Sequence, residues 1–228
     1  MKRFYKDVTV ADDLSIRLDG KSVLTPGKRK LALPTLQLAE AIAREWREQR
    51  DDIAPATMPL TKLANTAIDR SEVHREHIVA ELTGFARHDL LYYRASEPAE
   101  LVVCQQMAWD PLLDWIHQTT GALLATTKGV VHVAQDDTAI AALSRSLHAL
   151  DAWTLTGMHV ATTITGSFIL ALALKESRLS HVEAFASSRI DETFQATKWG
   201  LDAEAEARTR RLAAELETAA QFMALARP

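Results

Sequence analysis

Apolar and polar residues alternate over much of the first 33 residues, most clearly at residues 8–10 and 14–18. An alternation with a period of two is typical of strands that bury one face. Asp19-Gly20 follows the second run, and this dipeptide favours the positive-φ conformations of a tight hairpin turn. Pro26-Gly27 marks a second turn. We therefore expect a small antiparallel sheet of two to four strands at the N-terminus.

The spacing of apolar residues changes to three and four residues after Pro34, and this pattern continues to about Arg50. Such spacing predicts an amphipathic helix. We expect the helix to cover one face of the sheet, because a few short strands are not stable alone in water. Residues 53–59 contain Pro55 and Pro59, which interrupt helices, so this stretch is predicted to be a linker.

Nearly all of the chain after Pro59 has a helical pattern. The predicted helices lie near residues 60–69, 72–94, 98–120, 137–156, 157–176, 180–198 and 202–226. Ser180 and Glu183 have the spacing of a capping box, in which each side chain accepts a hydrogen bond from the other residue's backbone amide. Residues 121–135 are the exception, and they fit either a hairpin or an extended crossover.

These elements predict an α+β fold class, with a small N-terminal antiparallel sheet and a covering helix followed by a predominantly α-helical bundle domain. We expect the N-terminal α+β domain to span residues 1–59 and the helical bundle domain to span residues 60–228. Of the 228 residues, 47% are hydrophobic and 25% are charged, which is the composition of a globular protein with a substantial core.

Charge and cysteine content narrow the function classes. The formal net charge is −4 at pH 7, which argues against nucleic acid as a partner, although residues 1–33 are basic. Cys104 is the only cysteine, so an intramolecular disulfide is excluded, and its apolar neighbours predict a small buried thiol.

The longest apolar stretch, residues 160–174, is too short to insert into a membrane, and no signal-peptide core follows Met1. We expect a cytoplasmic protein.

No motif gives a convincing catalytic, cofactor or metal site. Gly20-Lys21-Ser22 lacks the first glycine of a phosphate-binding loop and lies in a predicted turn. His74 and His77 share a helix face without an obvious third ligand. Thr165-Gly166-Ser167 lies within a predicted apolar helix, where small residues favour close packing rather than nucleophilic attack. We therefore predict no catalytic residue, no metal and no cofactor.

Residues 190–195 have a pattern that allows a functional interpretation. On a helix, Ile190 and Phe194 share one face, whereas Asp191, Glu192 and Gln195 gather on the opposite side. Apolar rings beside acidic groups resemble a protein interaction surface. An ordinary amphipathic helix with solvated acids fits the same pattern, and the pattern alone favours this second interpretation.

Several short segments, in this order along almost the whole chain, match the pattern of a known family. They are Arg3-Phe4-Tyr5-Lys6, Leu18-Asp19-Gly20-Lys21, Thr25-Pro26, Leu33-Pro34-Thr35, Ala41-Ile42-Ala43, Glu45-Trp46, Met58-Pro59-Leu60-Thr61, Leu63-Ala64-Asn65-Thr66-Ala67-Ile68-Asp69, Asp89-Leu90-Leu91, Tyr93-Arg94, Trp109-Asp110-Pro111-Leu112, Gly166-Ser167, Asp191-Glu192, Gln195, Trp199-Gly200 and Asp202. In these segments the chain resembles the ATP12 family of F1-ATPase assembly chaperones, in its bacterial form.

The resemblance implies a small N-terminal α+β domain, a helical bundle and a function without catalysis. It also implies that the partner is the unassembled α subunit of F1-ATPase, held soluble until it joins the β subunit. The acidic residue of functional importance in the family falls at Asp191-Glu192. We expect a monomer whose partner-binding residues are Asp191, Glu192, Gln195, Phe185 and Trp199, with Glu192 imitating polar contacts of the β subunit.

Two alternatives from other function classes stay open. One is a hydrolase-type enzyme that uses the acidic pair with a histidine such as His159 or His181, which requires a pocket that joins these groups. The other is an adaptor whose basic N-terminal sheet binds an acidic partner through Lys28, Arg29 and Lys30.

Overall fold

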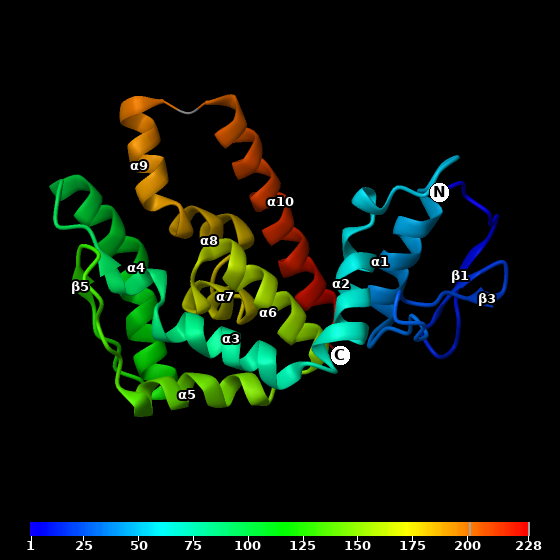
Figure 1. The fold of residues 1–228 in the computed structure, drawn as a ribbon, viewed down its shortest axis with the longest axis horizontal. Coiled ribbons are helices and arrows are strands. Elements are labelled where there is room, and N and C mark those ends of the chain that lie inside the picture. Colours follow the sequence, from blue (N-terminus) through cyan, green and yellow to red (C-terminus); the bar gives the residue numbers. More distant parts are fainter. Residues whose placement is uncertain (201, 228) are drawn as a thin grey trace. The chain divides into compact units, whose positions relative to one another are not determined.

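The computed structural model describes residues 1–200 and 202–227, and its chain forms two compact units (Figure 1). Unit 1 consists of Met1–Arg75, Asp151–Gly157 and Gln221–Pro228, and unit 2 consists of Glu76–Leu150 and Met158–Ala220. The fold is α+β, as the sequence predicts, with one small antiparallel sheet at the N-terminus followed mainly by helices.

The sheet of unit 1 has three strands in the order β1 (Val8–Val10), β2 (Ile16–Leu18) and β3 (Lys21–Ser22). All neighbours are antiparallel. Asp19 and Gly20 have φ angles of 48° and 78° in the turn between β2 and β3, so the predicted hairpin is confirmed. The Asp19 carboxylate also accepts hydrogen bonds from the backbone amides of Lys6 and Asp7, which holds the start of the chain beside this turn.

Helix α1 (Leu36–Arg47) packs against β1 and β2, as the apolar spacing predicts. Thr35 caps its first turn by accepting a hydrogen bond from the Leu38 amide. After a short 3-10 turn, η1 (Pro55–Thr57), helix α2 (Pro59–Thr66) continues into a π-helical turn, η2 (Ala67–Ser71). The core of this unit contains seventeen buried residues from the sheet, from these helices and from the C-terminal end of the chain, among them Ile16, Ile42 and Phe222.

Glu45 fixes α2 onto α1 inside this core. The residue is 8% exposed, and its carboxylate accepts hydrogen bonds from the backbone amides of Leu60 and Thr61, at 2.7 and 2.8 Å, and from the Thr61 hydroxyl at 2.6 Å. Pro59 occupies the first position of α2 and has no amide hydrogen, so the carboxylate serves the first donors that the helix presents. Burial raises the pKa of Glu45, and these three hydrogen bonds counteract that rise.

The remaining elements are mostly helices. They are α3 (Arg75–Arg87), η3 (Leu90–Tyr92), β4 (Tyr93–Arg94), α4 (Ala99–Thr120), β5 (Thr127–Lys128), α5 (Asp137–His148), α6 (Ala152–Thr165), α7 (Phe168–Lys175), α8 (His181–Ser188), α9 (Ile190–Trp199) and α10 (Ala203–Leu225). Within unit 2, α4 packs against α7, α8 and α9. The capping box of Ser180 and Glu183 is confirmed at the start of α8.

Four predicted helices, near residues 72–94, 137–156, 157–176 and 180–198, differ from the helices of the structure in where they begin and end. The segment predicted near residues 72–94 contains α3, a turn and β4; the boundary expected at 156/157 lies inside α6; and the segment predicted near 180–198 is divided at Arg189. The expectation that Thr165-Gly166-Ser167 lies inside a helix is wrong: α6 ends at Thr165, Gly166 has a φ of 68°, and Ser167 caps α7.

A buried carboxylate explains the break at Gly166. Asp89 is fully buried and accepts a hydrogen bond from the Ser167 hydroxyl at 2.7 Å and from the amides of Ile169 and Leu91, both at 3.0 Å. The Leu90 amide donates to the Gly166 carbonyl. Burial raises the pKa of Asp89 to about 6, although the hydrogen bonds oppose this rise.

The segment at residues 121–135 is an extended crossover rather than a hairpin. Its strand β5 pairs in parallel with β4, so that Tyr93 lies opposite Thr127, and the Gly129 amide donates to the Arg94 carbonyl at 2.7 Å. Parallel pairing requires a long connection between the two strands, which α4 supplies.

The boundary between the two compact units does not fall at residues 59 and 60, where we expect one domain to end and the next to begin. The expected division into domains stays a prediction. Leu60, Ala64 and Ala67 lie in the same core as the N-terminal sheet, so residues 60–75 group with unit 1 by their contacts. Two further expectations have direct answers. Cys104 is exposed rather than buried, and none of the helices among the described residues combines the length and apolar character needed to cross a membrane.

Candidate functional site

The predicted partner-binding residues lie on α8 and α9, two short helices that meet at Arg189. Phe185 belongs to α8, whereas Asp191, Glu192 and Gln195 belong to α9. Trp199 ends α9, and its side chain lies outside the described part of the chain. Because the helix is interrupted at Arg189, the faces of α8 and α9 do not continue one another as they would in a single helix.

Asp191 is directed toward α4 rather than toward solvent. It is partly buried, and its carboxylate accepts a hydrogen bond from the Gln105 side-chain amide at 2.7 Å. The carbonyl of the same Gln105 side chain accepts from the Ala95 backbone amide at 2.8 Å. Burial raises the pKa of Asp191; the hydrogen bond from Gln105 lowers it, and the charge of Glu192 raises it. Asp191 therefore joins α9 to α4 and is the less accessible of the two acids.

Glu192 lies on the exposed side of α9 and forms an ion pair with Arg189 at 2.8 Å. The Arg189 guanidinium also donates to the Ile164 carbonyl at 3.1 Å and lies 5.6 Å from the centre of the Phe185 ring. Arg189 thus brings Glu192 and Phe185 together at one place on the surface. Gln195 is exposed one turn further along α9.

An open groove of about 720 Å³ adjoins this ion pair. It is lined by Arg189 and Glu192 and by residues 202–212, which include Arg208 and Arg211. Asp202 caps α10 at this edge by accepting from the Ala205 amide at 2.7 Å. The groove therefore presents both acidic and basic groups to solvent, which suits recognition of a polar rim on another protein.

Sequence reasoning missed Arg189, Gln105 and Arg208. Gln105 is distant from α9 in sequence, separated from Asp191 by 86 positions, so no local pattern indicates the contact. Arg189 has its role only because the helix breaks at that residue, and the continuous helical pattern of residues 180–198 conceals the break.

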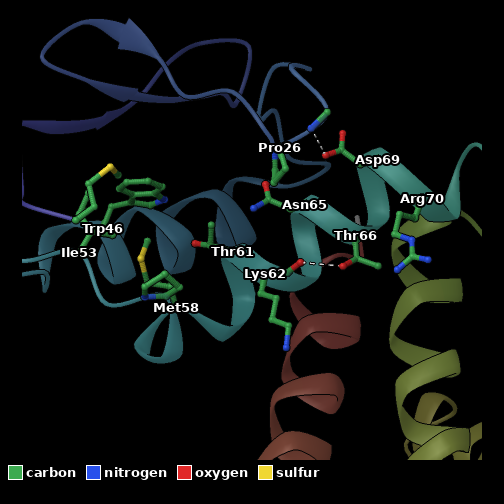
Figure 2. A pocket seen from close by; sticks show the side chains of 13 residues that line it. Pro26, Trp46, Ile53, Met58, Thr61, Lys62, Asn65, Thr66, Asp69 and Arg70 are labelled. Carbon is green, nitrogen blue, oxygen red and sulfur yellow. Dashed lines mark hydrogen bonds between the residues drawn. The ribbon is translucent and has the colours of Figure 1, made fainter.

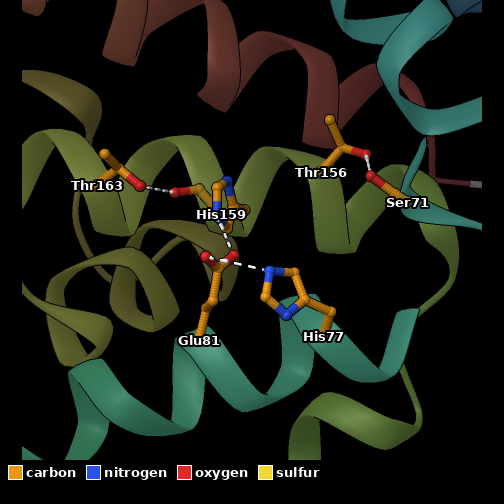
Figure 3. A network of polar contacts seen from close by, with 6 residues as sticks. All are labelled: Ser71, His77, Glu81, Thr156, His159 and Thr163. Carbon is orange, nitrogen blue, oxygen red and sulfur yellow. Dashed lines mark hydrogen bonds and ion pairs between the residues drawn. The ribbon is translucent and has the colours of Figure 1, made fainter. Parts of the chain in front are cut away.

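The histidines named for a hydrolase-type site pair with other glutamates. His159 lies 3.1 Å from Glu81, which also lies 3.5 Å from His77, as Figure 3 shows. His181 lies 3.8 Å from Glu217. The contacts of Asp191 and Glu192 described above go to Gln105 and Arg189 instead. Among the described residues, no group of three or more metal-ligating side chains has the geometry of a metal site.

Comparison with known proteins assigns the chain to a family. The family model described as ATP12 chaperone protein matches residues 2–117, which is half of the chain. The chain belongs to the ATP12 chaperone family. This agrees with the resemblance found in the sequence, and the description of the family is that of a chaperone rather than an enzyme.

Solved structures of ATP12 proteins extend the match beyond residue 117. The crystal structure of Atp12 from Paracoccus denitrificans is 39% identical, with a TM-score of 0.94, and the match covers 99% of this chain and 98% of that one. A mutant of that protein in which lysine replaces an aspartate has a TM-score of 0.95 at the same identity and coverage. A candidate chaperone from Agrobacterium tumefaciens is 40% identical, with a TM-score of 0.92, and the match covers 99% of this chain and 85% of that one. The α8–α9 surface is therefore part of the shared fold.

Proposed function

We propose that this protein is an assembly chaperone of F1-ATPase, which binds the unassembled α subunit and promotes its incorporation into the complex. The proposal places its action in the bacterial cytoplasm, as a monomer and without a cofactor. Membership of the ATP12 chaperone family is the single observation that carries it. A subunit that waits for its neighbours exposes an apolar interface that promotes aggregation, and a chaperone that covers this interface prevents it.

We place the contact with the client on the α8–α9 surface, around Glu192, Arg189 and Phe185. Glu192 is 57% exposed in its side chain, so it is available to a partner, whereas Asp191 is already engaged by Gln105. A client that offers its own cation to Glu192 would release Arg189 from the ion pair and uncover the Phe185 ring. Charged groups at such a rim contribute more to encounter and register than to affinity, which suits a partner that must later leave.

The test is co-purification with the α and β subunits of F1-ATPase from the same host, without added nucleotide. We expect selective capture of α by the wild-type protein, and about tenfold weaker binding after Glu192→Lys, because the substitution places like charges together at the rim. Glu215→Lys is a matched control, since Glu215 is also an exposed glutamate paired with an arginine one turn earlier, Arg211 at 3.9 Å.

Each part of the proposal has its own contrary result. Failure of the wild-type protein to retain α contradicts the proposed partner. Equal binding by the Glu192→Lys and Glu215→Lys variants contradicts the placement on α9 but leaves the partner standing. Turnover of a small substrate that is lost after Asp191→Asn would instead favour the hydrolase-type alternative.

A further inference from the structure

A cavity of about 640 Å³ opens on unit 1, and none of the residues that line it is assigned above to client binding (Figure 2). Trp46, Ile53 and Met58 provide much of its apolar wall. Asn65 lines it from α2, and Lys62 and Arg70 are exposed cations at its edge. Its volume lies in the range of pockets that hold a ligand or a few side chains, about 300–1,000 Å³.

Hydrogen bonds within unit 1 fix the wall formed by the turn at Pro26-Gly27. Asp69 accepts from the Thr25 hydroxyl and from the Gly27 amide, both at 2.7 Å, as the dashed line to the turn in Figure 2 indicates for Gly27. A Cβ atom on Gly27 would lie 2.6 Å from the Asp69 carboxylate, so only glycine allows this approach. On the opposite side, Glu45 holds the start of α2 in place. The cavity is thus preformed in the free protein.

Several polar groups of the residues that line the cavity have no partner among the described residues. The indole nitrogen of Trp46 is buried and finds no hydrogen-bond acceptor among the described residues. A buried donor without an acceptor destabilises a fold by about 1–3 kcal/mol. The side chains of Asn65, Lys62 and Arg70 make no hydrogen bond or ion pair that the described residues account for, whereas both oxygens of Asp69 are engaged. Lys62 and Arg70 therefore outweigh the single carboxylate of Asp69, and the net charge of these three lining side chains is positive.

Several of the segments that carry the family resemblance line the cavity. Thr25-Pro26, Glu45-Trp46 and the run from Met58 to Asp69 contribute most of the lining residues. The match to the ATP12 family model, residues 2–117, includes the whole lining apart from Met1, whereas α8 and α9 lie beyond it. The client surface proposed above gives these segments no role.

We propose that this cavity is a second client site, which receives an extended segment of the client chain with a large apolar side chain next to one or more carboxylates. The inference rests on the proposed function, because it takes the client to be the α subunit. The apolar side chain packs against Trp46, Ile53 and Met58, and the adjacent carboxylate faces Lys62 and Arg70.

The polar groups favour a polypeptide over a lipid. The amide of Asn65 both donates and accepts hydrogen bonds, as a peptide group does, so the two are complementary. A fatty acid could satisfy the cations with its carboxylate, but its hydrocarbon chain would leave the Asn65 amide without a partner.

The experiment measures binding of purified F1 α subunit to the full-length protein and to variants of the cavity. Asn65→Trp fills the space from an accessible helix position, and the double variant Lys62→Glu/Arg70→Glu reverses the charge at the opening. Lys21→Glu, on the exposed strand β3, controls for charge reversal elsewhere in unit 1. Thermal unfolding confirms that each variant is folded, and the double variant, which alters exposed residues only, keeps the test valid if Asn65→Trp unfolds.

We expect Asn65→Trp to weaken α binding at least tenfold at any salt concentration, because it excludes the apolar side chain. The double variant should weaken binding about tenfold at low salt and much less at high salt, whereas Lys21→Glu should have little effect. A photo-crosslinking amino acid at position 65 should join a client segment with an apolar residue beside Asp or Glu, identified by mass spectrometry.

Three results would overturn the inference, and they are distinct. Full α binding by folded Asn65→Trp and by the double variant removes the cavity from client binding while the proposed function stands. Failure of the wild-type protein to bind α rejects the proposed function and the cavity inference with it. A fatty acid retained by the wild-type protein and lost in Asn65→Trp, as seen by native mass spectrometry, replaces the polypeptide with a lipid.

Discussion

The two compact units each bury one carboxylate at the start of a helix, and the difference between the two sites is instructive. In unit 1, Glu45 accepts hydrogen bonds from residues 15 and 16 positions further along the chain, at the start of α2. In unit 2, Asp89 accepts from Ser167 and Ile169, which are 78 and 80 positions away, at the start of α7. A buried carboxylate that accepts hydrogen bonds from the start of a helix therefore joins neighbouring segments in unit 1 and segments far apart in the sequence in unit 2.

Burial also differs between the two sites. Asp89 is completely buried, whereas Glu45 keeps a small exposed fraction of 8%. The hydrogen-bond donors that lose their acceptor without Glu45 are therefore closer to water than the donors that lose theirs without Asp89. A buried donor without an acceptor destabilises the fold more when water is excluded more completely. The comparison therefore predicts that removing the Asp89 carboxylate lowers the free energy of unfolding more than removing the Glu45 carboxylate.

The strongest test of this comparison is Asp89→Ala. We expect it to reduce the free energy of unfolding by about 3 kcal/mol, because the Ser167 hydroxyl and the amides of Ile169 and Leu91 lose their acceptor in a dry interior. Urea unfolding followed by circular dichroism measures the effect. Asp114→Ala, at an exposed position of α4, is the control. A loss no larger than that of the control would show that Asp89 does not anchor α7.

The pH dependence of the same site has a definite sign. Burial raises the pKa of Asp89 from 3.8 to about 6, so the folded protein holds a proton over a range where the unfolded chain has released it. The stability that this group contributes is present below about pH 4 and is lost as the pH rises to about 6. The gap in unfolding free energy between wild type and Asp89→Asn should therefore narrow from pH 4 to pH 7. A gap that widens would contradict the raised pKa.

The matching change in unit 1 is Glu45→Ala, with an expected loss of about 2 kcal/mol. Its effect should be smaller than that of Asp89→Ala, because water reaches the freed amides of Leu60 and Thr61 more readily. Glu45→Gln keeps one acceptor oxygen and should lose less. Equilibrium unfolding at pH 7 ranks Asp89→Ala, Glu45→Ala and Glu45→Gln by their loss of unfolding free energy. A larger loss for Glu45→Ala than for Asp89→Ala would contradict the comparison.

Substitution of two glycines of unit 2 by alanine measures the cost of backbone strain separately from the contribution of the buried carboxylate. Gly166 has a φ of 68°, and no atom lies within 4 Å of the position that a Cβ would take, so Gly166→Ala should destabilise by about 1 kcal/mol through strain alone. Gly84 lies inside α3 with equally open space, and Gly84→Ala should stabilise by about 0.5–1 kcal/mol. Thermal unfolding of both variants gives opposite shifts if this interpretation is correct.

Removal of the Glu81 carboxylate should have the smallest effect on stability, and it serves as the exposed counterpart of the two buried carboxylates. It contacts His77 and His159 (Figure 3), but all three side chains are substantially exposed, from 36% to 73%. Glu81→Ala should change the free energy of unfolding by less than about 0.5 kcal/mol, and the change should decrease at high salt. A loss as large as that of Glu45→Ala would mean that burial is not what distinguishes the two anchoring carboxylates.

The local features of the chain were accessible to sequence reasoning. The Asp19-Gly20 turn, the helix that follows Pro34 and the capping box at Ser180 depend on residues within a few positions of one another. Patterns of apolar spacing likewise identified the α+β class, and the order of short motifs identified the family. The chemistry of each local feature is complete within a short segment, so the segment is enough to predict it.

The candidate site was predictable only in part. The acidic and aromatic character of residues 185–195 is visible in the sequence, and it directs attention to α8 and α9. The sequence does not distinguish Asp191 from Glu192, because the difference lies in Gln105, a residue of another helix. The cavity beside Trp46 was not predicted at all, since its walls come from a turn, two helices and a linker.

By itself, the sequence determined the N-terminal strands, the approximate places of most helices and the family to which the chain belongs, because these follow from short-range periodicity and residue type. Only the tertiary structure decided where helices stop and which acids are buried. The breaks at Gly166 and Arg189, and the burial of Asp89 and Asp191, depend on partners between 25 and 86 positions away. A hydrogen bond across such a distance forms only once the intervening chain has folded, so it leaves no pattern in the neighbouring residues.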